Sequence, residues 1–419
     1  MGKGNYDVII LGAGPAGLSL ASVLSRQNKV CVIEKRRIGF TTKSWGSFRD
    51  LIRKLKLNDC VANDKINFLQ FNHYLGAKWL FKDTYCQLYE NKLLREFINR
   101  CDKDTTFIQN SYVRDFRRKD GGISIKTGKK TLWAKLLIDC TGASSPIIKK
   151  YRLIDNYSSF PILGYNLKGI KVDPTKFIWD VMKIPGLDEI MVGGVMPYSD
   201  KMAQVHVFPY LKNKTMQSSS LEKYLKTFMS SYPGLKGAKK VSRTRGTILM
   251  GELKKNALDN IFFFGEAGLW SPRFTGAGVN QILMDHQAVG KELSRLIKED
   301  RLSAGFLSEI RPLTQEKRML HLLRCFENIV LSFKDKPERL NEFLVVLNES
   351  HAKFGKYLMR NKFNALVLKN SWKKVHEHFS TMELVKMLPK QDILFLFELG
   401  TELIEDEVLK KYRKHLKDI

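Results

Sequence analysis

Three glycines with a fixed spacing provide the first chemical signal in the chain. Gly12, Gly14 and Gly17 follow an apolar run at residues 6–11 and precede a helical pattern of apolar residues over 18–24. At such a turn the first glycine permits a tight bend, the second lets a diphosphate approach the backbone, and the third lets the helix pack closely on the strand. The helix N-terminus also favours negative charge. The spacing therefore predicts a site for the diphosphate of a dinucleotide.

An acidic residue follows where a ribose would lie. Glu34 ends a second apolar run at residues 29–34, and its carboxylate can accept hydrogen bonds from ribose hydroxyls. A carboxylate there disfavours a phosphorylated ribose and so favours FAD or NAD over NADP, although Lys35 and Arg36 beside it weaken this exclusion. The succession of strand, glycine turn, helix and strand predicts a right-handed βαβ unit with a parallel sheet.

Two later segments resemble fingerprints of a known flavoprotein superfamily. Residues 139–145 (DCTGASS) follow an apolar strand at 135–139, and residues 264–268 (FGEAG) precede residues 275–281 (TGAGVNQ). In order and spacing, the glycine segments resemble those of flavoproteins related to p-hydroxybenzoate hydroxylase. The resemblance extends over the chain to about residue 300, and it implies FAD rather than NAD as the cofactor.

The same resemblance implies roles for single residues. Glu266 would accept a hydrogen bond from a ribityl hydroxyl, and Gly276 and Gly278 would let the backbone lie against the pyrimidine edge of the flavin. The superfamily usually has Asp at the position of Glu266, so the longer side chain alters the local geometry. Arg49 would pair with the diphosphate or, equally well, lie exposed at a helix start. The residues predicted to bind the cofactor are Gly12, Gly14, Ala16, Gly17, Glu34, Lys35, Arg49, Thr141, Gly142, Gly265, Glu266, Gly276, Ala277, Gly278 and Asn280.

Within the superfamily, the chain resembles the lycopene cyclase and geranylgeranyl reductase branch. The similar segments are residues 173–180, 195–198 and 207–210, together with the helices that follow residue 311. The resemblance implies a polyisoprenoid substrate. Lycopene cyclases carry an acidic FLEET-like motif at the end of the corresponding strand, whereas this chain has HVFPY at residues 206–210. This departure argues against carotenoid cyclisation.

No catalytic residue is identified by the sequence. His206 is either a proton donor near the flavin or a buried histidine on a strand, and Tyr210 and Trp270 have the same two interpretations. His376 and His378 lie two apart on a predicted helix and therefore point to different faces, which makes them a poor metal pair. No metal site is predicted.

The elements that must position these residues form an α/β protein. We expect a Rossmann-like FAD-binding domain from residues 1–157 and 251–300, a mostly antiparallel β substrate lobe at 158–250, and a C-terminal helical region at 301–419. Helices are predicted over about 47–56, 91–100 and 280–298. A hairpin is predicted from residues 123–125 and 131–133.

The composition of the chain limits the kinds of partner that we expect for the protein. The formal charge is +28, yet the basic residues are spread along the chain without a nucleic-acid-binding module, so nucleic acid is not an expected partner. The apolar, basic tail from residue 383 suggests either helices packed on the body or peripheral association with anionic membranes. No stretch has eighteen uninterrupted apolar residues, no secretory signal is visible, and the six cysteines are scattered. A cytoplasmic protein is expected, with peripheral association at the membrane as the open alternative.

The leading functional hypothesis is hydride transfer between FAD and a hydrophobic, isoprenoid-like substrate. With a single GxGxxG unit, the chain needs an external reductant, either NAD(P)H or a redox protein. Two alternatives remain open: oxygen insertion through a flavin hydroperoxide, and a redox-neutral cyclase or isomerase reaction.

Overall fold

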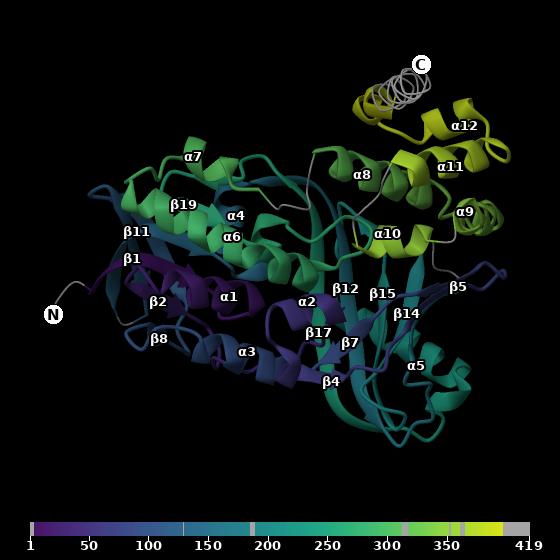
Figure 1. Ribbon diagram of the computed structural model, residues 1–419, viewed down its shortest axis with the longest axis horizontal. Coiled ribbons are helices and arrows are strands. Elements are labelled where there is room, and N and C mark those ends of the chain that lie inside the picture. The colour runs from purple at the N-terminus through teal and green to yellow at the C-terminus, as the bar shows by residue number, and fades with distance from the viewer. Residues whose placement is uncertain are drawn as a thin grey trace, which may run out of the picture.

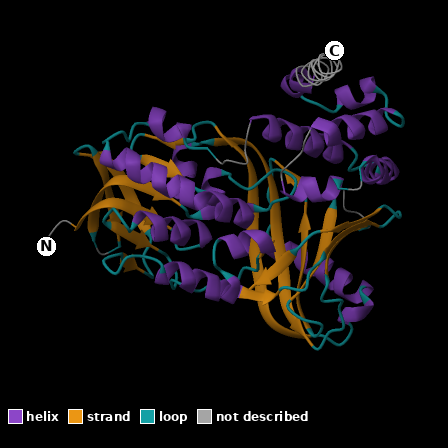
Figure 2. Cartoon of the chain, viewed as in Figure 1, coloured by secondary structure: helices purple, strands orange, loops and turns teal. Residues whose placement is uncertain are grey.

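Two large sheets and the helices that cover them make up the protein. The structure is a computed structural model, and it describes residues 4–128, 130–184, 189–311, 317–351, 353–360 and 365–396. The sheet that contains the N-terminal strand lies at one end and the second sheet at the other, with the last helices stacked over the second sheet (Figures 1 and 2).

The first sheet has the parallel core predicted from the glycine motif. Its strand order is β18-β19-β11-β1-β2-β8, with β10 and β9 added at β11. Val8 of the central strand pairs in parallel with Leu136 on one side and Val30 on the other. The strands are β1 (Gly4–Leu11), β2 (Val30–Ile33), β8 (Thr106–Ile108), β9 (Val113–Lys119), β10 (Gly122–Thr127), β11 (Thr131–Asp139), β18 (Ala257–Leu258) and β19 (Ile261–Phe263).

Both faces of this sheet are buried, which explains why its central strand is continuously apolar. Val8 and Ile10 point into a core shared with the long helices, whereas Ile9 and Leu11 point into the core on the opposite face. The helices of this half are α1 (Pro15–Leu24), α2 (Arg49–Lys54), α3 (Glu90–Asn99), α4 (Pro146–Tyr151), α6 (Gly278–Lys298) and α7 (Ala304–Glu309).

The second sheet is mostly antiparallel, as predicted. Its order is β16-β12-β15-β14-β13-β5-β6, with β17 paired to β12; among the strands that the structure describes in this sheet, β13 and β5 alone pair in parallel. Its strands are β5 (Phe68–His73), β6 (Lys78–Lys82), β12 (Ile154–Lys168), β13 (Lys176–Met182), β14 (Met191–Pro197), β15 (Met202–Pro209), β16 (Leu211–Lys212) and β17 (Lys239–Leu253). A third, small sheet joins β3 (Gly46–Phe48), β7 (Tyr85–Leu88) and β4 (Val61–Asn63).

The two faces of the second sheet have different covers. α5 (Glu222–Ser231) packs on one face, where Leu225 and Phe228 meet Val205 and Val207. The opposite face, which carries Phe177 and Val192, shares its core with the C-terminal helices. These are α8 (Lys317–Ser332), α9 (Pro337–Ser350), α10 (Phe354–Arg360), α11 (Ala365–His376) and α12 (Thr381–Lys386). Short 3-10 turns are found at Asn58–Cys60, Gly142–Ser144, Ser218–Leu221, Pro233–Leu235 and Gly265–Gly268.

Three local differences from the sequence predictions have physical causes. The helix expected from residue 47 begins at Arg49, because residues 46–48 pair with β7 instead. The hairpin of β5 and β6, which lies inside the range predicted for the FAD domain, joins the second sheet through β13. The predicted domain boundaries near residues 158 and 250 fall inside β12 and β17, which pair along most of their length.

Candidate active site

The glycine turn after β1 shows what each of its three glycines does. Gly12 has a φ of 98°, and a Cβ added to it would lie 2.5 Å from the carbonyl oxygen of Cys140. A Cβ on Gly17 would lie 1.9 Å from the carbonyl oxygen of Gly12. The fold therefore requires glycine at both positions, because a side chain there would collide with the backbone. A Cβ on Gly14 would meet nothing within 4 Å, so this glycine borders open space.

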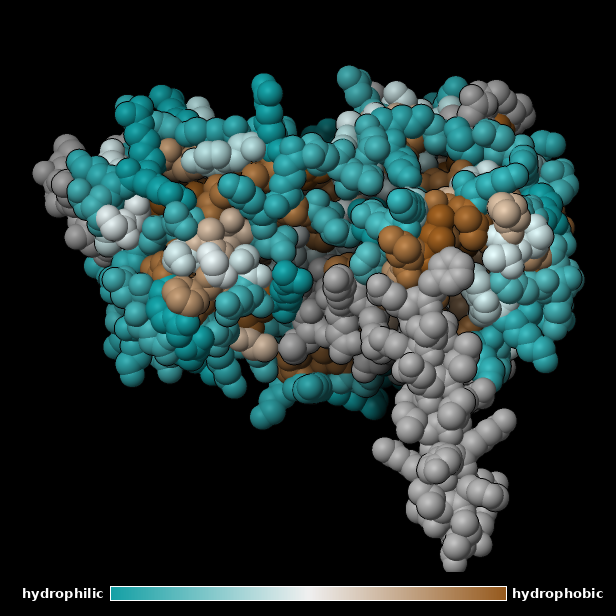
Figure 3. All heavy atoms as spheres, turned by 90° about the horizontal axis from the view of Figure 1, so that it is seen from above, coloured by the Kyte–Doolittle hydropathy of each residue, from teal (hydrophilic) through white to brown (hydrophobic). Residues whose placement is uncertain are grey.

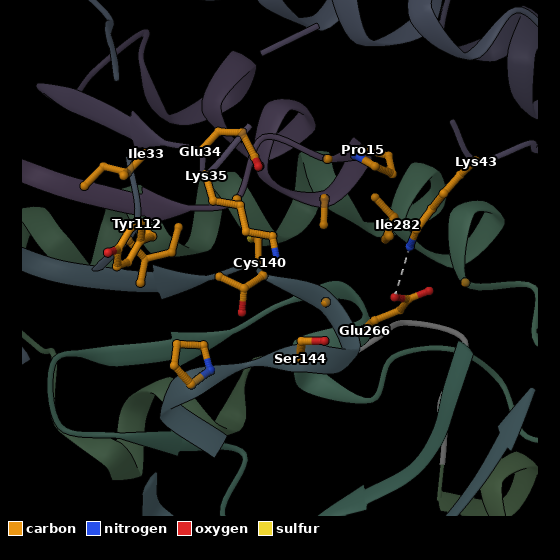
Figure 4. Close-up of a pocket in the computed structure, with 18 of the residues that line it drawn as sticks. Pro15, Ile33, Glu34, Lys35, Lys43, Tyr112, Cys140, Ser144, Glu266 and Ile282 are labelled. Carbon is orange, nitrogen blue, oxygen red and sulfur yellow. Dashed lines mark ion pairs between the residues drawn. The ribbon is translucent and has the colours of Figure 1, made fainter. Parts of the chain in front are cut away.

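That open space is a cleft of about 380 Å³ at the carboxyl ends of the parallel strands. Such a position, beside the first strand of a doubly wound sheet, is where this fold class binds nucleotides. Glu34 and Tyr112 border one part of the cleft, and Lys43 and Glu266 border another (Figure 4). Its wall also contains Leu11, Gly12, Gly14, Pro15, Ala16, Ile33, Lys35, Trp45, Cys140, Thr141, Gly142, Ser144, Pro146, Gly278, Val279 and Ile282.

The Glu34 carboxylate is held in place at the cleft. One oxygen accepts a hydrogen bond from the backbone N–H of Ala13 at 2.8 Å, and the other accepts one from the N–H of Arg36 at 2.9 Å. Each carboxylate oxygen can accept more than one hydrogen bond. Glu34 therefore couples the glycine turn to the end of β2 and retains capacity for a ligand hydroxyl.

Two helices start at the cleft without a side-chain cap. Gly14 is the N-cap of α1 and Ala277 is the N-cap of α6, and neither helix has an acidic residue in its first turn. The first N–H groups of a helix have no partner within the helix and carry a partial positive charge. Both helix starts are thus suited to a diphosphate or to another electron-rich group.

The second fingerprint is organised by a buried carboxylate. Asp139 accepts hydrogen bonds from the N–H and the hydroxyl of Thr141, at 2.9 and 2.6 Å, and from the hydroxyl of Ser145 at 2.5 Å. Burial raises the pKa of Asp139 above its ordinary value. These bonds fix the turn at Thr141 and Gly142, which form part of the cleft wall.

An ion pair joins two loops across the cleft. The Nζ of Lys43 lies 3.5 Å from the Glu266 carboxylate, as the dashed line in Figure 4 shows. The sequence interpretation did not select Lys43, because a lysine in a loop has no distinguishing pattern. Only the folded structure shows that Lys43 lies beside Glu266 at the cleft.

Most of the predicted cofactor residues meet at this site. The cleft is lined by Gly12, Gly14, Ala16, Glu34, Lys35, Thr141, Gly142, Glu266 and Gly278, and the adjoining cavity is lined by Gly276, Ala277 and Asn280. Gly17 and Gly265 lie in the supporting turns and line neither space. The structure does not bring Arg49 to the site either; its guanidinium lies 3.5 Å from the carbonyl oxygens of Ile66 and Tyr85.

The adjoining cavity, which we call the junction cavity, lies between the turn at 275–278 and the second sheet. It measures about 190 Å³ and shares Lys43, Trp45 and Glu266 with the cleft. Thr275 lines it, and the Thr275 hydroxyl is buried without a hydrogen-bond partner among the described residues. A buried hydroxyl of this kind indicates a missing polar partner at the site.

A third space, which we call the apolar cavity, continues from the junction cavity towards the C-terminal helices. It measures about 100 Å³ and shares Phe160, Trp179, Phe208, Thr275 and Met359 with the junction cavity. Its remaining lining is aromatic and aliphatic, apart from the phenol of Tyr210: Phe71, Trp79, Phe81, Val181, Ile190, Val192, Phe274, Val330, Leu340, Leu344, Gly355 and Leu358. The three spaces thus form one series, from polar to apolar.

A buried ion pair holds the turn that lies between the cleft and the C-terminal helices. Arg273 and Glu327 are 4% and 1% exposed and lie 2.7 Å apart, and the Tyr210 hydroxyl donates to Glu327 at 2.5 Å. Phe274, the residue after Arg273, has a φ of 68°, which is unfavourable for a bulky residue. Its ring packs edge-on against Phe326. α8 therefore fixes the shape of the turn that precedes Gly276.

The structure places His206, Tyr210 and Trp270, for which the sequence left two interpretations open, in three different surroundings. His206 lines the junction cavity, and Tyr210 lines the apolar cavity with its hydroxyl directed to Glu327. Trp270 packs against Phe264 in the core of the first sheet and lines none of the three spaces.

Comparison with known proteins gives the family. A model of the family described as lycopene cyclase protein matches residues 7–352. The chain belongs to this family. The comparisons place it in the branch that contains lycopene cyclases and geranylgeranyl reductases.

Individual relatives are distant. A neoxanthin synthase of Solanum tuberosum is 28% identical over 35% of this chain and 30% of its own length, so the chain matches only about a third of such plant relatives. A digeranylgeranylglycerophospholipid reductase of Methanococcus vannielii is 23% identical over 81% of this chain and 88% of its own length. A geranylgeranyl bacteriochlorophyll reductase-like protein of Thermoplasma acidophilum has the same fold, with a TM-score of 0.70 at 15% identity over 92% of this chain and all of its own. Among the described helices, none has the length and apolarity needed to cross a membrane.

Proposed function

We propose that the cleft and the junction cavity together bind FAD. Glu34 would hold the adenosine ribose, the start of α1 the diphosphate, and the turn at 275–278 with the start of α6 the flavin ring. Three features support this assignment: the open space at Gly14, the two uncapped helix starts, and the unpartnered Thr275 hydroxyl. Bound there, FAD would supply or accept a hydride at the entrance of the apolar cavity.

We propose that the apolar cavity receives the reacting end of a hydrophobic, isoprenoid-type substrate. The observation that carries this proposal is the shared wall: Thr275 and Phe208 border the junction cavity and the apolar cavity alike. An apolar lining with few polar groups selects a hydrocarbon chain. The apolar cavity, of about 100 Å³, is continuous with the junction cavity through this shared wall, so a chain end can enter it from that side.

The residues of the chain then have distinct tasks. Lys43 and Glu266 close one side of the cofactor cleft, and aromatic rings such as Trp179 and Phe208 exclude water from the reacting atoms. Arg273 and Glu327 hold the turn that borders both the ring site and the substrate. The described part of the chain has one nucleotide cleft, so the reductant comes from outside, as NAD(P)H or as a redox protein.

The experiment that tests this function uses the full chain with FAD, reduced under anaerobic conditions. Addition of geranylgeraniol or of a digeranylgeranyl glycerophospholipid should restore the spectrum of oxidised flavin and yield a product with fewer double bonds. Val192→Trp, which fills the apolar cavity, should abolish this response and retain the flavin. A flavin that stays reduced with every prenyl compound would contradict the proposal.

The same experiment separates the two alternatives. Insertion of oxygen would require that O₂ be consumed in step with the substrate, with no reoxidation under anaerobic conditions. A redox-neutral reaction would convert the substrate to an isomer while the flavin spectrum ends as it began.

We also propose peripheral association with anionic membranes through the C-terminal helices. Trp372, Met382 and Leu394 are exposed there, and apolar side chains gather beside the residues drawn in grey (Figure 3). Exposed Lys373 and Lys386 lie on the same helices; the sequence-predicted basic residues after 396 lie outside the described residues. Co-sedimentation should be stronger with anionic than with neutral vesicles and should weaken at high salt. Equal failure to bind either vesicle would contradict this proposal.

A further inference from the structure

One buried histidine lies at the boundary between the cofactor site and the apolar cavity. His206 is on β15, is 7% exposed, and lines the junction cavity. Gly194 lies opposite it on β14, and a Cβ on Gly194 would come within 2.4 Å of the imidazole Nε2. The absent side chain of Gly194 therefore gives the ring its place on the sheet surface.

The neighbours of His206 determine which ring nitrogen carries the proton. The side-chain amide of Gln204 donates from Nε2 to the Thr244 hydroxyl at 3.3 Å. Its carbonyl oxygen then lies 2.7 Å from Nδ1 of His206. Because a carbonyl oxygen can only accept, Nδ1 must donate, and Nε2 of the neutral ring carries the lone pair.

The ring is neutral at physiological pH. Burial lowers the pKa of His206 to about 4, far below the ordinary value of 6.5 for histidine. Among the described residues, no hydrogen bond to Nε2 is found, and the ring faces the junction cavity. Nε2 thus has no donor among the described residues and is accessible from the junction cavity, which His206 lines.

The charges around the site narrow the kind of group that Nε2 can meet. Lys43, Arg245 and Glu266 line the junction cavity, but they also border the nucleotide side of the site. The apolar cavity has no lysine, arginine, aspartate or glutamate among its described lining residues. A prenyl diphosphate is ionised at neutral pH and has no hydrogen to donate to Nε2, and its charge would gain no ionic partner inside the apolar cavity.

We propose that His206 is a specificity residue that accepts, at Nε2, a hydrogen bond from a hydroxyl group of the hydrophobic substrate. The preferred substrate is then a hydroxylated isoprenoid, and neither a pure hydrocarbon nor a prenyl diphosphate satisfies the site equally well. This inference rests on the proposed function in that it places the substrate chain in the apolar cavity. Once the substrate covers Nε2, an acceptor left without a donor costs free energy, which provides the discrimination.

The test compares three ligands that differ only in their head group: geranylgeraniol, its methyl ether, and geranylgeranyl diphosphate. Binding to the FAD-loaded full chain is followed by the fluorescence of the tryptophans, of which Trp179 lines both cavities. The alcohol should bind about tenfold more tightly than the ether, which cannot donate. His206→Phe keeps an aromatic ring and should make the two affinities equal. His286→Phe, which replaces a buried histidine outside all three spaces, should preserve the tenfold difference.

A second measurement does not depend on a variant. In the ¹⁵N NMR spectrum of the native protein, His206 should show a protonated Nδ1 and a bare Nε2, and the Nε2 resonance should move on addition of the alcohol but not of the ether. Equal affinities for alcohol and ether in the native protein, tightest binding of the diphosphate, or a protonated Nε2 would overturn the role of His206 while leaving the cavity as a prenyl site. If none of the three ligands binds, the proposed substrate class fails together with the role of His206.

Discussion

The cleft that we propose for the nucleotide and the apolar cavity are built in different ways. The wall of the cleft comes from short segments that follow strands, and much of it is backbone at Gly12, Gly14 and Gly142. The apolar cavity is made of side chains spread from Phe71 to Met359, from strands of the second sheet and from the C-terminal helices. A backbone site is determined by local sequence, whereas a side-chain site is determined by long-range packing. The two sites should therefore respond differently to substitution.

The largest effect is expected where the two sites meet. Glu327→Leu leaves the buried Arg273 without its partner and should lower the free energy of unfolding by about 3–5 kcal/mol. The double variant Arg273→Met/Glu327→Leu removes both charges and should recover most of this loss. Urea unfolding measures both values; a loss below about 1 kcal/mol in the single variant would show that the pair does not join the two regions.

At the glycine turn beside the cleft, substitutions of Gly14 and Gly17 should separate an effect on FAD binding from an effect on folding. Gly14→Val has room in the free protein but obstructs the diphosphate, so it should weaken FAD binding at least hundredfold, about 3 kcal/mol, with little change in thermal stability. Gly17→Val should instead destabilise the fold, because a Cβ there would collide with the backbone at Gly12. Flavin titration and thermal unfolding of both variants test this contrast, which would be lost if Gly14→Val bound FAD normally.

A smaller effect is expected at the ribose end of the cleft. Glu34→Ala removes a charged hydrogen-bond acceptor and should weaken FAD binding by about 1–3 kcal/mol. It should leave the binding of prenyl ligands in the apolar cavity unchanged, because Glu34 lines only the nucleotide side. Titration of each variant with FAD and with geranylgeraniol checks both statements; an unchanged FAD affinity would remove Glu34 from the ribose site.

The smallest effect concerns pH and two buried histidines, His206 at the junction cavity and His286 on α6. Burial lowers the pKa of His206 and of His286 to about 4, below the ordinary 6.5. As pH falls below 6.5, the unfolded chain binds a proton that the folded chain refuses, so stability is lost until about pH 4. The loss should be roughly 1.4 kcal/mol per histidine at pH 5.5. His206→Phe and His286→Phe should each reduce the change in unfolding free energy between pH 7.5 and 5.5 by this amount; an unchanged difference would mean that the ring is hydrated.

The contrast between the two sites also explains what the sequence could predict. The positions of Gly12, Gly14 and Glu34 follow from local patterns, because each serves a turn or a strand end within one βαβ unit. The helix at 280–298 and the hairpin around residue 128 were likewise predicted by local periodicity, and the structure has them as α6 and as β10 with β11.

Long-range features could not be predicted in this way. Lys43 lines the cleft and Val330 lines the apolar cavity. Both positions depend on which loops and helices pack together, and no local pattern encodes such packing. The sequence of the hairpin at 68–82 is typical of β-strands, but it does not indicate which sheet the hairpin joins. The partner of Tyr210 lies on α8, more than a hundred residues away, so its engagement with Glu327 was visible only in the structure.

The most direct test of the cofactor assignment is a comparison of FAD with FMN. Both are titrated into the flavin-free full chain, and binding is followed by the quenching of flavin fluorescence. If the flavin ring lies at 275–278 and the adenosine reaches Glu34, FAD should bind at least about hundredfold more tightly than FMN, since only FAD occupies the start of α1 and the ribose site together. Equal affinities for the two flavins, or no binding of either, would contradict the assignment of the cleft as a dinucleotide site.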